Sequence, residues 1–334
     1  MTAQAAMTGR AGISRAWAVN LQRYSIVLML IVVTVVFASM SDAFLSTRNL
    51  SNILLQASAI GIAAIGVTFV LIIGEIDISI GALMSLAMTI AWMVAVIPGA
   101  GAGQQAGVSA WVYPVGILVG VGLGVVNGLL INVLKINAFI ATLATMFAFR
   151  GIAWKMVGSS DKAFAESPVM YLARTEFFGI GLPVYLLAAV AIIAVVVLNR
   201  TPFGRYLYAM GGSPRSAVES GLPVNKLRVI AFGIVGLCSA LAGLIIVGRV
   251  GTLQAGLGVG FEFTVITAVV LGGTSLMGGR GSIIGSILGA ILLVVIDNGL
   301  NLINASVYIY DVVKGVILIV AVVIDVLLVR KLKL

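Results

Sequence analysis

Long runs of aliphatic residues, separated by short polar segments, dominate the chain from Ile26 to Val329. Several runs are near the ~20 residues that a helix needs to cross the hydrocarbon core of a bilayer. None alternates in polarity as the strands of outer-membrane barrels do. The pattern therefore predicts an all-α polytopic membrane protein with about ten transmembrane helices, at about 25–45, 53–73, 79–97, 111–133, 138–157, 182–199, 228–249, 262–276, 281–303 and 310–329.

Two polar segments lie between predicted helices. Residues 158–181 carry charges of both signs and are expected outside the cell, whereas residues 200–227 form a basic loop that is expected inside. Neither reaches the ~50 residues of a small separate domain. We therefore expect one integral-membrane domain over residues 25–330, with short cytoplasmic segments at 1–24 and 331–334.

The distribution of Lys and Arg predicts the orientation, because positive residues gather in cytoplasmic loops. With the N-terminus inside, most of the 20 Lys and Arg residues fall on the cytoplasmic side: Arg10, Arg15, Arg23, Lys135, Arg200, Arg205, Arg215, Lys226, Arg228, Arg280, Arg330, Lys331 and Lys333. Both termini are therefore expected in the cytoplasm. The same bias accounts for the net charge of +9, so no nucleic-acid partner is expected.

The stretch "LIIGEIDISIGAL" places two carboxylates inside an apolar run. An Asp at the centre of a membrane helix costs ~2.5–3.5 kcal/mol. Glu75, Asp77 and Ser79 are two positions apart, so they share a side only on an extended segment. Gly74 and Gly81 permit such a backbone. The sequence predicts a helix break in which Asp77 or Ser79 caps the third span; whether these acids brace helix ends or contact a solute stays open.

A second break, "LGGTSLMGGRGS" at Leu271–Ser282, contains Gly273, Thr274 and Ser275. It lacks the G-x-x-x-x-G-K-[ST] pattern of a nucleotide-binding loop. We expect a tight cytoplasmic turn in which small residues let helices approach closely. Because both breaks join an aliphatic run to a helix of small residues, they suggest inverted repeats of two five-helix halves, although any two glycine-broken helices look alike.

Composition restricts the chemistry further. Only 9% of the residues are charged and 61% are hydrophobic, against ~25% charged in a soluble domain. The chain has no histidine, and its one cysteine, Cys238, lies in an apolar run, so neither His-ligated metals nor a disulfide framework is expected. No cofactor or metal site is predicted. Asn298 and Asn301, three apart on one helix face, either hydrogen-bond a solute hydroxyl or bridge two helices.

The basic loop contains signals for a short ordered element. In "GRYLYAMGGSPRSAVESGLPVNKLR" a Gly204-Arg205-Tyr206 turn precedes a helix at about Pro214–Ser220. Ser213 is suited to cap this helix, Pro214 to its first position, and Gly221 to the left-handed position after its end. A short capped helix between two spans is typical of a docking element for a cytoplasmic partner.

An ordered set of motifs resembles the permease subunits of ribose-type ABC sugar importers. The matching stretches are "GEIDISIGALMSLA", "FIATLATMFAFRG", the loop quoted above, "AVVLGGTSLMGGRGSIIGSILGA", "DNGLNLI" and "YIYDVVKGVILIVAVVIDVLL". They cover about residues 45–330. Glu75 departs from the family pattern, in which glycine is more common at this position.

The resemblance implies a non-catalytic subunit of the bacterial inner membrane that forms the translocation path. A separate cytoplasmic subunit would bind and hydrolyse ATP, a periplasmic or lipid-anchored protein would deliver the sugar, and two permeases, identical or related, would pair. The residues implied to couple to the ATPase are Gly204, Arg205, Pro214, Arg215, Glu219 and Gly221. The candidates for the breaks and the path are Gly74, Glu75, Asp77, Ser79, Gly81, Gly273, Thr274, Ser275, Asn298 and Asn301.

Two other classes of protein compete with this interpretation. An ion- or proton-coupled secondary transporter would use Asp77 as a relay and would work without an ATPase. An intramembrane enzyme would need a catalytic constellation, and Ser79 with Asp77 lacks a base. The sequence does not identify the solute.

Overall fold

The computed structural model covers residues 1–334, and the structure described below comprises residues 26–97, 107–164 and 167–332. Its helices are Ile26–Met40, α2 (Thr47–Ile72), α3 (Ile80–Ala95), α4 (Val112–Leu134), α5 (Ala138–Val157), α6 (Pro168–Arg174), α7 (Leu182–Arg200), α8 (Pro202–Gly212), α9 (Pro214–Glu219), α10 (Val224–Val250), α11 (Phe261–Leu271), α12 (Ile283–Leu302) and α13 (Val307–Leu332). Three antiparallel pairs of two-residue strands join β1 (Val96–Ile97) to β2 (Gly107–Val108), β3 (Lys162–Ala163) to β6 (Thr252–Leu253), and β4 (Glu176–Phe177) to β5 (Ile180–Gly181).

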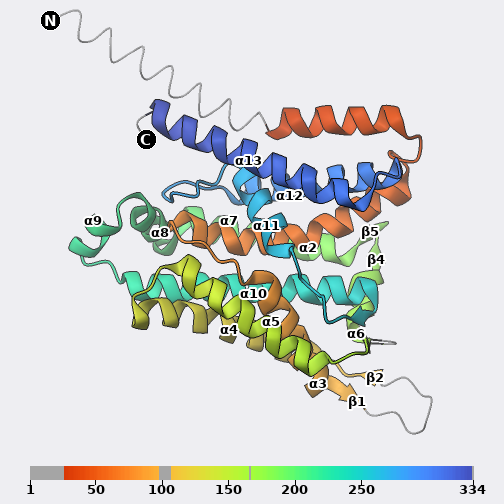
Figure 1. The fold of residues 1–334 in the computed structure, drawn as a ribbon, viewed down its shortest axis with the longest axis horizontal. Coiled ribbons are helices and arrows are strands. Elements are labelled where there is room, and N and C mark those ends of the chain that lie inside the picture. Colours follow the sequence, from red (N-terminus) through yellow and green to blue (C-terminus); the bar gives the residue numbers. More distant parts are fainter. Residues whose placement is uncertain (1–25, 98–106, 165–166, 333–334) are drawn as a thin grey trace, which may run out of the picture.

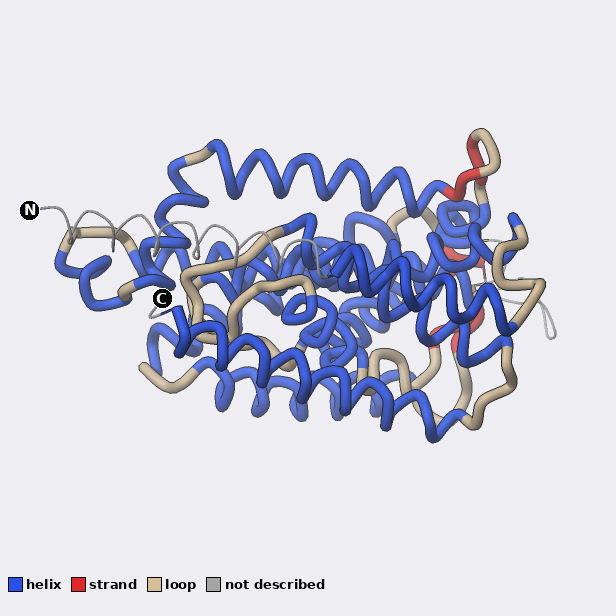
Figure 2. The backbone as a smooth tube through the Cα atoms, turned by 90° about the horizontal axis from the view of Figure 1, so that it is seen from above, coloured by secondary structure: helices blue, strands red, loops and turns tan. Residues whose placement is uncertain are grey.

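The long helices run along the longest axis of the molecule (Figure 1). Helices α8 and α9 lie at one end, which we call the loop end. Strands β1, β2, β4 and β5 lie at the opposite end, which we call the hairpin end. Seen from above, non-helical stretches run between the helices (Figure 2).

The helices follow the predicted apolar runs closely. Within the described residues, six are long and apolar enough to cross a membrane: α2, α4, α5, α7, α10 and α12. The helix Ile26–Met40, α3 and α11 are shorter apolar helices. The prediction of a polytopic all-α membrane protein is therefore confirmed. Helix α11 ends at Leu271 rather than near 276, because the chain turns at Gly272 and Gly273.

Helices α2 and α10 form the centre of the core, and α10 packs along α4 through glycines. A Cβ atom at Gly124 would lie 2.2 Å from the carbonyl oxygen of Phe232, and one at Gly120 would lie 2.7 Å from that of Gly236. Side chains larger than hydrogen do not fit these positions. Gly116, Gly120, Gly124 and Gly128 repeat every four residues, the spacing that lets membrane helices approach closely.

Glycines also allow α11 and α12 to pack closely. A Cβ atom at Gly289 would lie 2.0 Å from the carbonyl oxygen of Ala268, and one at Gly285 would lie 2.1 Å from that of Gly272. The predicted close approach of helices at the second break is therefore present. Small residues, rather than large apolar ones, determine how tightly both helix pairs pack.

Candidate functional site

The first predicted break is present where the sequence places it. Helix α2 ends at Ile72, Gly74 has a φ of +77°, and residues 75–79 are not helical before α3 begins at Ile80. A positive φ is the conformation that glycine adopts at no steric cost. The chain therefore passes through this part of the bundle as non-helical backbone, which membranes tolerate only where protein or a water-filled cavity surrounds it.

Asp77 is completely buried inside this break. Its Oδ1 accepts hydrogen bonds from the backbone N–H of Ser79 at 2.8 Å and from the Ser79 hydroxyl at 2.7 Å. Asn127 of α4 donates to the same hydroxyl oxygen at 2.8 Å. Ser79 occupies the N-cap position of α3, but its side chain makes no capping bond. Asp77 thus fixes the start of α3 and links it to α4.

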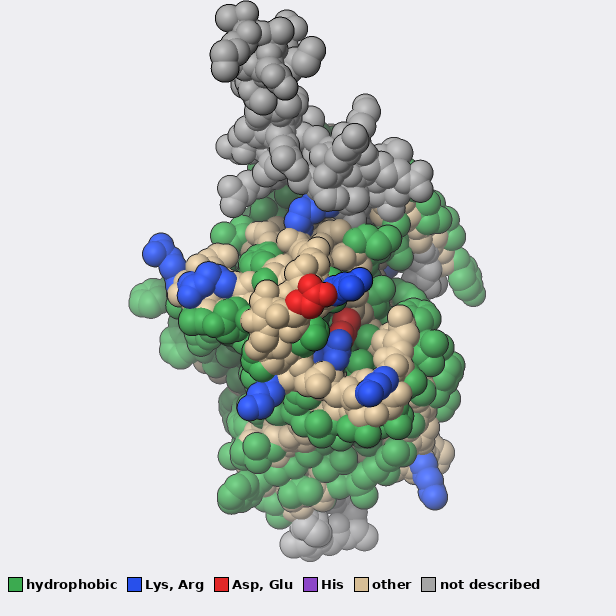
Figure 3. Space-filling view, turned by 90° about the vertical axis from the view of Figure 1, so that its left-hand side faces the viewer, with side chains coloured by type: hydrophobic (Ala, Val, Ile, Leu, Met, Phe, Trp, Pro, Cys, Tyr) green, Lys and Arg blue, Asp and Glu red, His purple; other side chains and the backbone are tan. Residues whose placement is uncertain are grey.

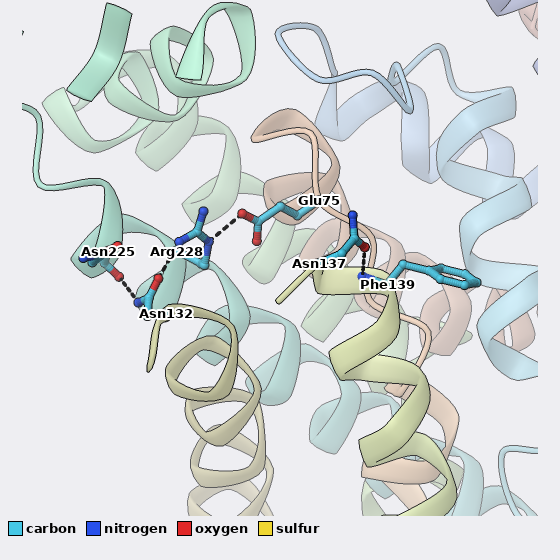
Figure 4. A network of polar contacts seen from close by, with 6 residues as sticks. All are labelled: Glu75, Asn132, Asn137, Phe139, Asn225 and Arg228. Carbon is cyan, nitrogen blue, oxygen red and sulfur yellow. Dashed lines mark hydrogen bonds and ion pairs between the residues drawn. The ribbon is translucent and has the colours of Figure 1, made fainter. Parts of the chain in front are cut away.

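Glu75 faces a different partner, so the two acids of the break do not act together. The guanidinium Nε of Arg228, in the first turns of α10, donates to Glu75 Oε1 at 2.5 Å (Figure 4). Arg228 Nη1 also donates to Asn132 Oδ1, and Asn132 Nδ2 donates to the carbonyl oxygen of Asn225 at 2.8 Å. This Glu75–Arg228 network ties the break to both α10 and the end of α4.

A cavity of about 320 Å³ lies beside this network. Its lining includes Glu75, Arg228 and Asn137. Asn137 caps α5, because its Oδ1 accepts a hydrogen bond from the backbone N–H of Phe139 at 2.8 Å (Figure 4). At the first break, therefore, the Glu75–Arg228 pair lines a cavity, whereas Asp77 is buried in the core.

The second break is a tight turn held by its own polar side chains. Thr274 and Ser275 are buried, and Gly273 has a φ of +88°. The hydroxyl of Ser275 accepts a hydrogen bond from the backbone N–H of Met277 at 3.2 Å. The Thr68 and Ser286 hydroxyls, on α2 and α12, lie 2.7 Å apart. These contacts match the tight turn expected from the sequence.

The two breaks meet each other and the end of α8. The backbone N–H of Gly279 donates to the carbonyl oxygen of Ile72 at 2.8 Å, at the C-terminal end of α2. A Cβ atom at Gly211 of α8 would lie 1.8 Å from that same oxygen, and one at Gly278 would lie 2.8 Å from the Gly74 Cα. We call Ile72, Gly74, Gly211, Gly278 and Gly279 the glycine junction.

The glycine junction bears on the expected repeat. Spans related by a five-helix inverted repeat have their equivalent segments at opposite ends of the bundle. Because the two breaks touch, they lie at the same end. Their similarity in sequence is therefore not a signature of such a repeat, and it reflects instead the small residues that a shared turn region requires.

A second backbone crossing lies where α3 and α11 begin. A Cβ atom at Gly81 would lie 2.0 Å from the carbonyl oxygen of Gly258, and Gly258 itself has a φ of +78°. Beside this crossing, Glu262 of α11 is 2% exposed and pairs with Arg150 of α5 at 3.2 Å. Two short helices therefore start back to back inside the bundle, each after a stretch of non-helical chain.

The two asparagines of α12, Asn298 and Asn301, lie in different environments. Asn298 exchanges two hydrogen bonds of 2.8 Å with Asn49 of α2, and both side chains are buried. Asn298 thus bridges two helices, which is one of the two alternatives that the sequence left open. Asn301 is exposed.

The basic loop folds into two helices instead of one. The sequence predicted a turn at Gly204-Arg205, and this is wrong, since both residues lie in α8, which Thr201 caps by accepting from the N–H of Gly204. A Cβ atom at Gly204 would lie 1.9 Å from the carbonyl oxygen of Leu198, so this glycine permits the sharp corner after α7. Arg205 is exposed.

Helix α9 agrees with its prediction. It begins at Pro214, is capped by the Ser213 hydroxyl, and is followed by Gly221 with a φ of +77°. Arg215 and Glu219 form an exposed ion pair of 2.9 Å one turn apart. At the loop end, Lys and Arg side chains are spread over the surface, with few acidic ones among them (Figure 3).

Within the described residues, three ion pairs between separate segments were not foreseen from the sequence: Glu75–Arg228, Arg150–Glu262 and Asp297–Lys314. Their common signal is an isolated charge inside or beside an apolar run. Such charges are costly in hydrocarbon unless they are paired. A search of the apolar runs for isolated charges of opposite sign would find these residues. The sequence alone does not tell which acid pairs with which base.

Broken helices that cross at glycines inside an apolar bundle are typical of membrane transport proteins. Residues 49–322 match the family described as the permease component of branched-chain amino acid transport systems, and the chain belongs to this family.

The curated relatives of the chain include several sugar permeases. It is 35% identical to the ribose import permease protein of Escherichia coli K12, over 97% of this chain and 99% of that protein. It is 37% identical to the ribose import permease protein of Bacillus subtilis 168, over 91% of this chain and 93% of that protein. The L-arabinose transport system permease protein of Escherichia coli K12 is 36% identical over 89% of both chains. No solved structure matches.

Proposed function

We propose that the chain is the membrane-spanning subunit of an ATP-driven importer for a monosaccharide or a similar solute. The observation that carries the proposal is the similarity, over almost the whole chain, to permeases named for ribose, D-allose and L-arabinose. The subunit itself catalyses no reaction. A cytoplasmic subunit supplies the energy by binding and hydrolysing ATP, and a binding protein delivers the solute to the hairpin end.

Helices α8 and α9 are the proposed docking element for the ATPase. The exposed side chains of Arg205, Arg215 and Glu219 are available to a partner. The buried side of α8 carries Gly211, which packs against the carbonyl oxygen of Ile72. A displacement of α8 therefore acts directly on the glycine junction and on both helix breaks. This contact is the physical route by which a partner at the loop end alters the bundle.

We further propose ten membrane crossings, with the loop end and both termini in the cytoplasm. The positive residues of the loop end support this orientation. Helix contacts support an inverted repeat in which α3 with α4 and α5 corresponds to α11 with α12 and α13. In such a repeat the glycine crossing of Gly81 and Gly258 joins equivalent positions of the two halves.

A second permease subunit is the remaining proposed partner. Large apolar side chains are exposed on α13 and α11, among them Val312, Val316, Ile319 and Phe263, each more than half exposed. Lipid or another subunit covers such a surface in a membrane. No observation favours a secondary transporter that uses Asp77, since the carboxylate is engaged with the start of α3.

Purification of the subunit under mild detergent from its native host tests the proposal. We expect an ATPase to co-purify in a fixed ratio, and its turnover to rise when a sugar-loaded binding protein is added. The matched control is Gly221→Pro, which disturbs the end of α9 while leaving the apolar helices unchanged. Purification of the wild-type subunit alone, with solute uptake driven by an ion gradient, would contradict the proposal.

A further inference from the structure

Two adjoining cavities lie on the flank of the bundle, at the start of α11. One has a volume of about 330 Å³ and is lined by residues of α2, α3, α10, α11, α12 and α13. The other has a volume of about 320 Å³ and lies between α11 and α13. Both are lined by Gly260, Thr264 and Lys314. We call the two together the flank chamber, and each half has the size of a small-molecule site.

A charged pair forms part of the chamber wall. Lys314 Nζ of α13 lies 3.0 Å from Asp297 Oδ2 of α12, and the two side chains are 25% and 24% exposed. Both residues lie within apolar runs of the sequence. A partly buried ion pair adds little stability over apolar side chains of the same size. Its presence at the surface of a cavity therefore points to a ligand rather than to packing.

Lys314 keeps hydrogen-bond donors while the pair is intact. A lysine ammonium has three donors. Lys314 therefore has donors beyond the one directed to Asp297. Thr264, on the first turns of α11, donates its hydroxyl proton to the carbonyl oxygen of Gly260 at 3.4 Å and contributes a hydroxyl oxygen that can accept. Gly260, the N-cap residue of α11, has no side chain to cover the first turn of that helix.

Apart from Thr267, the other side chains of the lining are apolar, and they include Ile60, Met84, Ile246 and Phe261. A few polar groups in an apolar wall suit a ligand with hydroxyl groups on a carbon ring. A zwitterionic ligand is less suitable, because its two charges would have to separate the Asp297–Lys314 pair before binding to it. A neutral polyhydroxylated ligand bridges the same pair without breaking it.

The position of the chamber suits a transport step. Gly258 lines it and also forms the backbone crossing with Gly81, where two half-helices start inside the bundle. Discontinuous helices of this kind surround solute sites in other transport folds. The chamber opens on the flank of the bundle, since Val259 and Phe263 at its edge are 57% and 59% exposed.

We propose that the flank chamber holds the solute during its passage through the membrane, and that Asp297, Lys314 and Thr264 bind the hydroxyl groups of a neutral molecule of monosaccharide size. The assignment rests on the proposed function for the presence of a transported sugar. It goes beyond that function by naming a site in the permease, in residues that were not among the candidates predicted from the sequence.

Cysteine accessibility tests the site directly. The one native cysteine, Cys238, is 2% exposed, so Thr264→Cys adds a single reactive thiol. We expect a small water-soluble methanethiosulfonate to modify it, and ribose, D-allose or L-arabinose presented with the binding protein to slow the modification at least about threefold. Trp111→Cys at the hairpin end, where Trp111 is 68% exposed, is the control whose rate stays constant. Protection by leucine instead of the sugars would reject the ligand class.

Uptake by variants separates binding from structure. We expect Asp297→Asn and Lys314→Gln each to reduce sugar uptake about tenfold while the ATPase still co-purifies. The exchanged pair, Asp297→Lys with Lys314→Asp, retains a salt bridge but reverses the groups offered to the solute, so uptake should remain low. Full recovery in the exchanged pair would show a purely structural role and overturn the inference.

Failure of the proposed function has a different signature. If no ATPase binds the wild-type subunit, the importer assignment is wrong, whereas the protection assay on the isolated subunit still reports whether a sugar enters the chamber. If the ATPase binds and the assembled wild-type complex takes up none of the three sugars, the sugar assignment of the chamber is rejected.

Discussion

Replacing Glu75 with Gln removes the charge that faces Arg228 at the first break. The side chains of this pair are 13% and 21% exposed. Breaking a fully buried pair costs ~3–5 kcal/mol, and exposed pairs contribute ~0.2–1 kcal/mol. Partial exposure places the Glu75–Arg228 pair between these limits, so we expect Glu75→Gln to lower the free energy of unfolding by about 2 kcal/mol.

The protein contains its own control for this estimate. Arg215 and Glu219 form an ion pair whose side chains are 91% and 64% exposed. Glu219→Gln should therefore change stability by no more than ~0.5 kcal/mol. Thermal unfolding in detergent, followed by tryptophan fluorescence, measures both variants; a loss of about 2 kcal/mol corresponds to roughly 2–5 °C for a chain of this size.

A double-mutant cycle completes the test. Glu75→Gln and Arg228→Gln should each destabilise, and the double variant should lose less than the sum of the two, because the partner left unpaired in each single variant is absent. Equal melting temperatures for Glu75→Gln and Glu219→Gln would refute the reasoning. A strictly additive cycle would show that the two side chains do not interact in the membrane.

Three further outcomes are expected. Gly81→Ala should sharply lower the yield of folded protein, since its Cβ atom would lie 2.0 Å from a carbonyl oxygen, whereas Gly122→Ala on the exposed face of α4 should not; size-exclusion profiles compare the two. Asp77→Ala removes two hydrogen bonds and should destabilise by about 2 kcal/mol, more than Asp77→Asn, which retains an accepting oxygen; melting temperatures decide. Arg205→Glu should abolish uptake while membrane insertion stays normal, and normal uptake would argue against docking at α8.

The apolar runs were sufficient to predict the helices, because burial in a bilayer demands continuous hydrophobic length. The glycines around residue 74 predicted the first break for an equally local reason. Helix α8 was missed because its signals are weak: Gly204 reads as a turn residue, although Thr201 caps the helix just before it. The loop was therefore interpreted from its glycines alone.

The partners of the charged residues depend on tertiary packing, and the sequence does not encode them locally. Asn298 and Asp297 are neighbours on α12, yet Asn298 bridges to α2 while Asp297 faces Lys314. The motif drew attention to the two asparagines because of their spacing. Only the orientation of α12 between α2 and α13 shows which neighbour lines a cavity.

The polar contacts between α2 and α12 also determine when the protein finishes folding. Thr68 meets Ser286, which follows it by 218 positions, and Asn49 meets Asn298, which follows it by 249. At ~5–20 residues per second, ribosomal synthesis reaches these partners roughly 10–50 seconds after α2 has been made. Throughout that interval α2 lacks its polar partners from α12. We therefore expect the N-terminal half to complete its packing only after α12 has been made, so that substitutions in α12 also affect helices synthesised long before it.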